Sequence, residues 1–127
     1  MAPATLVSFD IENGDQVIKA LEAAGKSPKV ALWAKLPDYE NWRLVLAADE
    51  LDRASQFTSY SAINRAMKDA AIPIHRQPAI LLRPMNNPMI AALRQTFSKA
   101  SDVYGMRLGG QRFGDKYLED AFVYRIR

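Results

Sequence analysis

The sequence predicts an α+β protein, in which a single layer of mostly antiparallel sheet carries three helices in the order α-β-β-α-β-α-β-β. Apolar residues recur at helical spacing in three segments, and five short apolar runs have the composition of strands. Mixed hairpins and helices imply that the helices pack on one face of the sheet. With 127 residues and 49% hydrophobic residues, the chain suits one core, so residues 1–127 are expected to form a single domain.

The first helix is predicted over Asn13–Ala24, where Asn13 or Asp15 would cap its start and a glycine follows its end. Two strands, Val30–Leu36 and Trp42–Ala47, come next. The short polar loop Pro-Asp-Tyr-Glu-Asn between them indicates a hairpin.

The second helix is predicted over Phe57–Ala71, because apolar residues recur there at three- and four-residue steps from its first residue onward. A separate turn over Asp49–Asp52 precedes it, and Pro73 ends it. Ala79–Arg83 follows as a short apolar strand of the kind that is buried on both faces. The helices that flank this strand favour parallel pairing with a neighbour.

Asn87 is a natural N-cap and Pro88 a natural first residue for the third helix, which is expected to end near Ala100. Val103–Leu108 and Leu118–Ile126 then form a second hairpin. The loop Gly-Gly-Gln-Arg-Phe-Gly-Asp-Lys between them leads into a strand and not into a helix. We therefore expect a mobile connection there and not a phosphate-binding loop.

Strand alternation separates the two tryptophans of the chain, which both lie in the first hairpin. Pairing even-numbered with even-numbered positions is the register that unites the apolar side chains. That register places Trp42 toward the core with Leu44 and Leu46, and it places Trp33 on the reverse face.

The same alternation in the second hairpin adds three arginines to this reverse face. The candidate binding residues are one aromatic and five basic side chains: Trp33, Lys35, Arg43, Arg107, Arg125 and Arg127. Such a group can contact phosphates while the ring stacks a base.

Three interpretations of this face stay open. It is a half-solvated surface whose cationic stems lie over Trp33, or a contact with a partner protein or a second copy, since aromatics and arginine are enriched at interfaces. Nucleic-acid binding is the third, because residues 61–127 hold eleven basic and five acidic residues. The chain lacks the run of exposed aromatics that is typical of sheet-based RNA readers.

No catalytic signature emerges from the sequence. The one histidine, His75, lies in a proline-flanked connector, where it is more often incidental than catalytic. Pro37-Asp38 resembles the start of a Mg²⁺-dependent nuclease motif, but no Asp-x-Lys or Glu-x-Lys follows to complete it. Small groups of acidic residues keep a metal-dependent enzyme as an alternative. The sequence favours a non-catalytic protein, with no cofactor and no metal ligands expected.

The compartment is predicted from what the sequence lacks. It contains no cysteine, and its first residues show neither a basic region nor a long apolar run. No apolar run approaches the roughly 20 residues that a membrane-spanning helix needs. We therefore expect a cytoplasmic protein with no membrane association.

Ala-Leu-Trp at 31–33, Pro37, Trp-Arg-Leu-Val-Leu-Ala at 42–47 and the terminal Asp-Ala-Phe-Val-Tyr-Arg resemble a group of small bacterial proteins of unknown function. The resemblance covers most of the chain. It implies no activity, ligand or site, and it favours a stand-alone cytoplasmic protein. Taken together, these observations predict a non-catalytic binding or oligomerisation module, with a nucleic-acid-binding protein or a small metal-dependent enzyme as alternatives.

Overall fold

The computed structural model describes residues 5–97 and 99–127. Its elements are α1 (Ser8–Ala23), β1 (Val30–Lys35), β2 (Arg43–Ala47), α2 (Gln56–Asp69), β3 (Ile80–Leu82), α3 (Pro88–Phe97), β4 (Gln111–Phe113), β5 (Lys116–Leu118) and β6 (Asp120–Ile126), with 3₁₀ turns at Asp49–Leu51 and Ile74–Arg76. The α+β class is confirmed, and the order of helices and strands agrees with the prediction apart from one additional short strand near the C-terminus.

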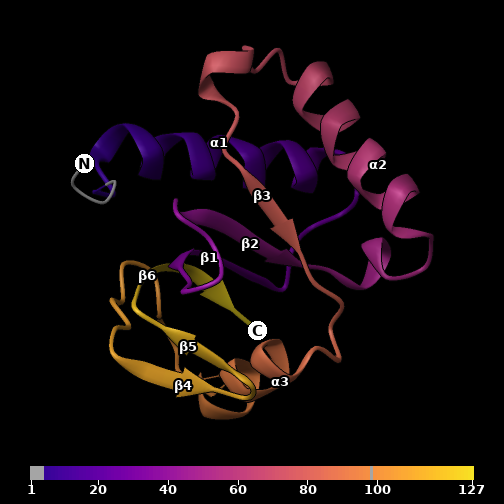
Figure 1. The fold of residues 1–127 in the computed structure, drawn as a ribbon. Coiled ribbons are helices and arrows are strands. Elements are labelled where there is room, and N and C mark those ends of the chain that lie inside the picture. The colour runs from indigo at the N-terminus through magenta and orange to yellow at the C-terminus, as the bar shows by residue number, and fades with distance from the viewer. Residues whose placement is uncertain (1–4, 98) are drawn as a thin grey trace.

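Four strands form the main sheet in the order β3-β2-β1-β6 (Figure 1). β1 is antiparallel to both β2 and β6, whereas β3 runs parallel to β2. The parallel pairing expected for this strand is therefore confirmed, and α2 provides the crossover between β2 and β3. Because β3 and β6 end the strand order, they are the two edges of the sheet.

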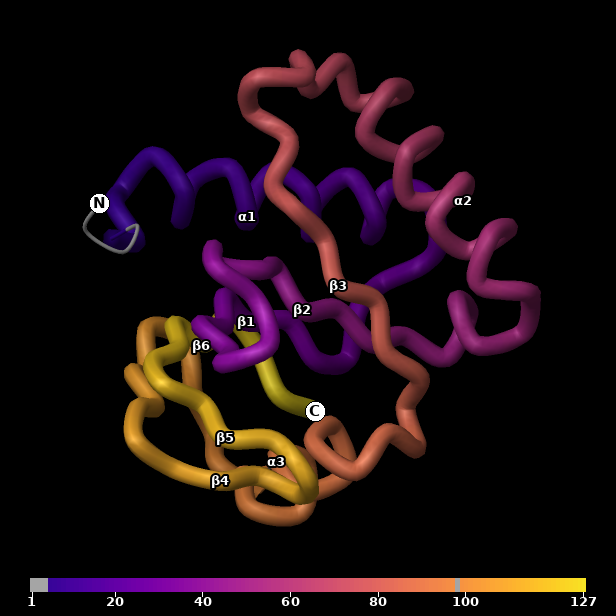
Figure 2. The backbone as a smooth tube through the Cα atoms, viewed as in Figure 1, coloured from indigo at the N-terminus to yellow at the C-terminus, as the bar shows by residue number. Residues whose placement is uncertain are grey.

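Both faces of the sheet are covered. α1 and α2 pack on one face, and α3 together with the β4–β5 hairpin packs on the other (Figures 1 and 2). The expectation that the helices lie on one face was wrong. The physical reason is that β1 and β2 are apolar along almost their whole length, which is the pattern of strands buried on both sides.

The predicted register of the first hairpin was also wrong. Trp33 pairs with Leu44, and Leu32 pairs with Val45, so odd-numbered positions of β1 face even-numbered positions of β2. Since both faces of these strands are apolar, the hydrophobic pattern does not discriminate between the two registers. Trp33 consequently lies in the same buried cluster as Leu44 and Trp42, and the expected core position of Trp42 is confirmed.

α1 begins before the predicted cap at Asn13. The carboxylate of Asp10 accepts a hydrogen bond from the backbone N–H of Val7 at 3.0 Å, which satisfies one of the free donors at the start of the helix. Asn13 is buried within the helix, where its side-chain oxygen accepts no hydrogen bond from any described residue. The Asn-Gly-Asp sequence that suggested a helix start is therefore part of the helix interior.

The cap of α3 is confirmed. The side-chain oxygen of Asn87 accepts a hydrogen bond from the N–H of Met89 at 3.0 Å. The described helix extends to Phe97. Its end was predicted near Ala100, and Ser98, between these two positions, lies outside the described residues.

The C-terminal region differs in detail from the predicted hairpin. Within Val103–Leu108, Arg107 forms an isolated bridge with Phe122 and no continuous strand is assigned. The Gly-rich loop, expected to be a mobile connection, instead forms the β4–β5 hairpin. Phe113 and Leu118 of this hairpin are buried in the cluster that includes α3. Apolar residues inside the loop therefore give it a packed structure.

Gly14 provides a test of how α1 approaches the sheet. A Cβ atom built on Gly14 would lie 2.7 Å from Cζ of Tyr124 and 3.0 Å from Nε1 of Trp33, well inside normal contact. Replacing glycine by alanine in a helix interior usually stabilises it by about 1 kcal/mol. We expect Gly14→Ala to destabilise the protein by about 1–3 kcal/mol, because the methyl group overpacks this contact. Urea unfolding measures the difference.

The control for this prediction is the same substitution in a Tyr124→Phe background, which removes the oxygen nearest to the new methyl group. The cost of Gly14→Ala should be smaller there, because the two sites are coupled. An equal cost in both backgrounds would show that contact with the Tyr124 hydroxyl is not its cause.

Candidate functional site

Trp33, predicted to face outward, is a buried structural residue with 5% of its surface exposed. Its indole Nε1 donates hydrogen bonds to the Tyr124 hydroxyl at 3.0 Å and to the carbonyl oxygen of Asp10 at 3.1 Å. The Tyr124 hydroxyl in turn donates to the carbonyl oxygen of Ile11 at 2.6 Å. These contacts join β1, β6 and α1, and Trp33 is not available to stack on a ligand.

A β-bulge directs two successive residues of β6 toward α1. Ala31 pairs with Arg125 and Leu32 pairs with Val123, so Tyr124 is the additional residue. Tyr124 contacts the N-terminal half of α1, whereas Nη2 of Arg125 contacts Glu22 near its C-terminal end at 2.9 Å. Both contacts hold the helix over the sheet.

The predicted cations are engaged in structural contacts. Arg125 also donates to the carbonyl oxygen of Pro28 at 3.2 Å, and Lys35 forms an ion pair with Glu119 at 3.4 Å. The guanidinium of Arg43 lies over the ring of Tyr39 at 4.7 Å.

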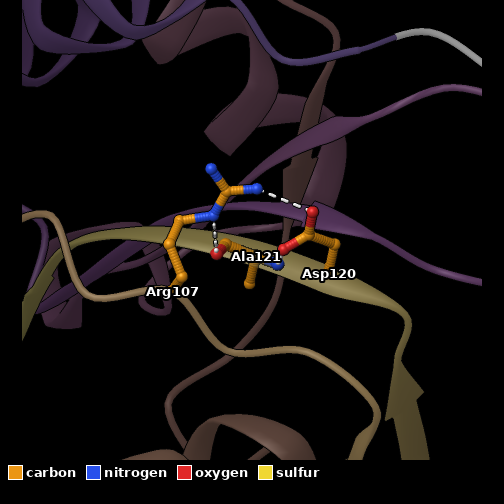
Figure 3. A network of polar contacts seen from close by, with 3 residues as sticks. All are labelled: Arg107, Asp120 and Ala121. Atoms are coloured by element: carbon orange, nitrogen blue, oxygen red, sulfur yellow. Dashed lines mark hydrogen bonds and ion pairs between the residues drawn. The ribbon is translucent and has the colours of Figure 1, made fainter.

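Arg107 is bound at the edge of β6 (Figure 3). Its Nη2 donates to a carboxylate oxygen of Asp120 at 2.6 Å, and its Nε donates to the carbonyl oxygen of Ala121 at 3.1 Å. The sixth candidate, Arg127, is exposed, and its carbonyl oxygen accepts a hydrogen bond from Arg94. The structure therefore does not bring the six candidate residues together on one open face of the sheet.

The part of the chain that the structure describes contains no group of three or more His, Asp or Glu side chains that could hold a metal ion. His75 is exposed in the 3₁₀ turn Ile74–Arg76. No described helix is long and apolar enough to cross a membrane.

A groove of about 270 Å³, lined by six apolar or aromatic residues and two polar ones, lies between α2 and the edge strand β3. We call it the α2–β3 groove. α2, the 3₁₀ turn, the connector after it and β3 all contribute to its lining, which consists of Tyr60, Ile63, Asn64, Met67, Ile74, Gln77, Pro78 and Ile80.

Two large apolar side chains are strongly exposed, one in the lining of the groove and one on α2 beyond it. Ile74, which lines it, is 84% exposed, and Phe57 is 82% exposed. Phe57 lies one turn before Tyr60 on the same side of α2. The spacing of Phe57 suggested a buried stripe, but the buried residues of α2 are Ser59, Ile63, Ala66 and Met67.

The groove also contains backbone groups of an open sheet edge. Ala79 and Arg83 bond to β2, and in a parallel ladder this directs the N–H and C=O groups of Ile80 and Leu82 outward. Leu82 is covered on this side: its N–H donates to the Tyr60 hydroxyl at 2.8 Å, and its carbonyl accepts from Arg83 at 3.0 Å. No described side chain covers the outward groups of Ile80 in the same way.

A second hollow, of about 350 Å³, lies between residues 100–104 and the end of β6. Three of its polar side chains are already engaged. Arg125 is held by Glu22, Asp102 accepts a hydrogen bond from the N–H of Tyr104, and the Tyr104 hydroxyl donates to Asp15. The α2–β3 groove, with its exposed apolar side chains and its open backbone groups, is therefore the stronger candidate.

No protein-family model, curated protein or solved structure matches this chain. The resemblance to a group of small bacterial proteins stays a prediction.

The groove was not among the sites predicted from sequence. Ala79–Arg83 was recognised as a strand, but its place at the edge of the sheet depends on strand order, which its local pattern does not contain. Helical spacing gave no signal for the groove, because it placed Phe57 in the buried stripe, whereas Phe57 is 82% exposed.

The environment of Tyr124 predicts a pH dependence of stability. Burial raises the pKa of Tyr124 well above that of an exposed tyrosine, and the hydrogen bond from Trp33 offsets only part of this rise. In the unfolded chain, tyrosine ionises near a pKa of about 10. Above that pH the unfolded state releases protons that folded Tyr124 retains, so the free energy of unfolding should decrease as pH rises.

Tyr124→Phe should make this alkaline decrease less steep. At neutral pH it should cost about 1–2 kcal/mol, because the Ile11 carbonyl loses its donor and Trp33 Nε1 keeps only the Asp10 carbonyl as an acceptor. Urea unfolding of both proteins at about pH 7 and about pH 11 tests the prediction. Equal alkaline losses for the two proteins would contradict it.

Proposed function

We propose that this protein is a non-catalytic binding module that docks a segment of a partner protein in the α2–β3 groove. The observation that carries the proposal is a groove lined mostly by apolar residues beside an open sheet edge. Ile74 lines this groove, Phe57 lies one turn before its lining residue Tyr60, and both side chains are more than four-fifths exposed. Exposed apolar side chains grouped around a groove are typical of protein interaction sites.

The expected gain from docking comes mainly from these two side chains. Burying an exposed Phe or Ile side chain contributes about 1.5–3 kcal/mol. Part of this gain offsets the ordering of the partner segment, so modest affinity is expected.

A partner protein is favoured over nucleic acid as the ligand. Base stacking on the sheet would require Trp33 on an open face, and Trp33 is enclosed beneath α1. A cytoplasmic location remains part of the proposal, supported by the absence of cysteine from the sequence.

The test is selection of a displayed library of random peptides against the protein, followed by affinity measurements on the enriched peptides. Phe57→Ser combined with Ile74→Ser should weaken their binding at least about tenfold, because two anchoring side chains are removed. Both positions are exposed, so the variant should keep its fold, which circular dichroism verifies.

Tyr117→Ser is the matched control, because it removes an exposed aromatic side chain from β5 on the other face of the sheet. It should leave peptide binding unchanged. The proposal fails if no peptide is enriched, or if the enriched peptides bind the groove variant as tightly as the wild type. Sedimentation that shows a dimer dissociated by the groove variant would identify a second copy as the occupant and would overturn the partner assignment.

A further inference from the structure

We infer that the segment docked in the α2–β3 groove is extended and acidic, and that it adds as a strand to β3 by displacing the Tyr60 hydroxyl from Leu82. This inference rests on the proposed function and specifies the partner of the same groove. It depends on three features: the outward backbone groups of β3, the side chains that cover some of them, and the charge of the surrounding elements.

Backbone groups distinguish a strand from a helix as the occupant. The outward N–H and C=O of Ile80 lie at the groove, because Ile80 both lines it and faces away from β2. A helix uses its own backbone groups internally and would bury those of Ile80 without a partner, which is unfavourable. An extended segment can pair with them, as in other complexes formed by strand addition.

Side chains protect the rest of this edge. The Tyr60 hydroxyl accepts from Leu82 N–H at 2.8 Å, and Arg83 donates to the Leu82 carbonyl at 3.0 Å. Covering an edge with side chains is a common way to prevent unwanted strand pairing. A strand that continues past Ile80 reaches Leu82 and competes with Tyr60 for its N–H. Tyr60 therefore acts as a removable cover on the binding edge.

The charge of the elements around the groove favours an acidic segment. From α2 to the end of the β3 segment, residues 56–83 contain Arg65, Lys68, Arg76 and Arg83 against the single acid Asp69. Within the described residues, none of these four cations forms an ion pair. Lys35, Arg107 and Arg125, by contrast, each have a carboxylate partner. The groove elements thus carry more basic than acidic residues, with Arg76 lying over the Phe9 ring and Arg83 donating to the Leu82 carbonyl, and this excess of positive charge favours an acidic partner.

The experiment uses synthetic peptides of equal length with blocked ends. One alternates valine and glutamate, a second alternates valine and lysine, and a third is the first peptide with all of its backbone amides N-methylated. The valine–glutamate peptide should bind, and its binding should protect the Ile80 amide from hydrogen exchange. The valine–lysine peptide should bind at least about tenfold more weakly because of charge, and so should the N-methylated peptide because it cannot pair with the edge.

Protein variants then test the two remaining features. Tyr60→Phe should raise affinity for the valine–glutamate peptide by about two- to tenfold, because Leu82 N–H no longer has an internal acceptor to give up. Lys68→Glu should lower this affinity, whereas Lys99→Glu, in the segment after α3, should leave it nearly unchanged and is the matched control.

The outcomes separate this inference from the proposed function. Suppose that the library peptides depend on Phe57 and Ile74, but that the Ile80 amide stays unprotected or the N-methylated peptide binds equally well. The proposed function would then stand, and strand addition would be overturned. A Tyr60→Phe variant that binds no more tightly would remove the role of Tyr60 as a cover. If the valine–glutamate peptide does not bind while library peptides do, the inferred chemistry of the partner is wrong. If neither kind of peptide binds, both proposals fail.

Discussion

The hydrogen bonds that Trp33 and Tyr124 make to the backbone of α1 hold together three elements that are far apart in sequence. Trp33 Nε1 donates to Tyr124 and to Asp10, and Tyr124 donates to Ile11. Gly14 permits this approach, because any side chain there would occupy the space of the Tyr124 ring. Polar groups buried in this way must be paired, so the position of α1 over β1 and β6 is closely restricted.

The closure of this face by α1 determines where the protein can meet other molecules. With α1 and α2 on one side and α3 with the β4–β5 hairpin on the other, the sheet has no free face. Its two edges remain. Residues 105–108 cover much of the β6 edge through bonds such as that from Gly105 N–H to Val123 O at 2.8 Å. The β3 edge is protected only by side chains, and it borders an apolar groove.

Local features could be predicted from the sequence to a considerable extent. Periodicity located three helices, Asn87 was recognised as a cap, and the parallel pairing of β3 followed from its flanking helices. Each of these depends on residues within a few positions of one another. The prediction of the register of the first hairpin was wrong because local alternation was not informative there. Its strands carry apolar residues on both faces, so alternation held no information about which face Trp33 would join.

The sequence by itself determined the α+β class, the order of the elements and the core position of Trp42. The tertiary structure alone decided that Trp33 is enclosed, that Arg125 pairs with Glu22 and Lys35 with Glu119, and that β3 lies at an edge. The physical reason is the range of the interactions. Helix caps and periodicity act between near neighbours, whereas ion pairs, strand order and the covering of a sheet face depend on residues that meet only when the chain has folded.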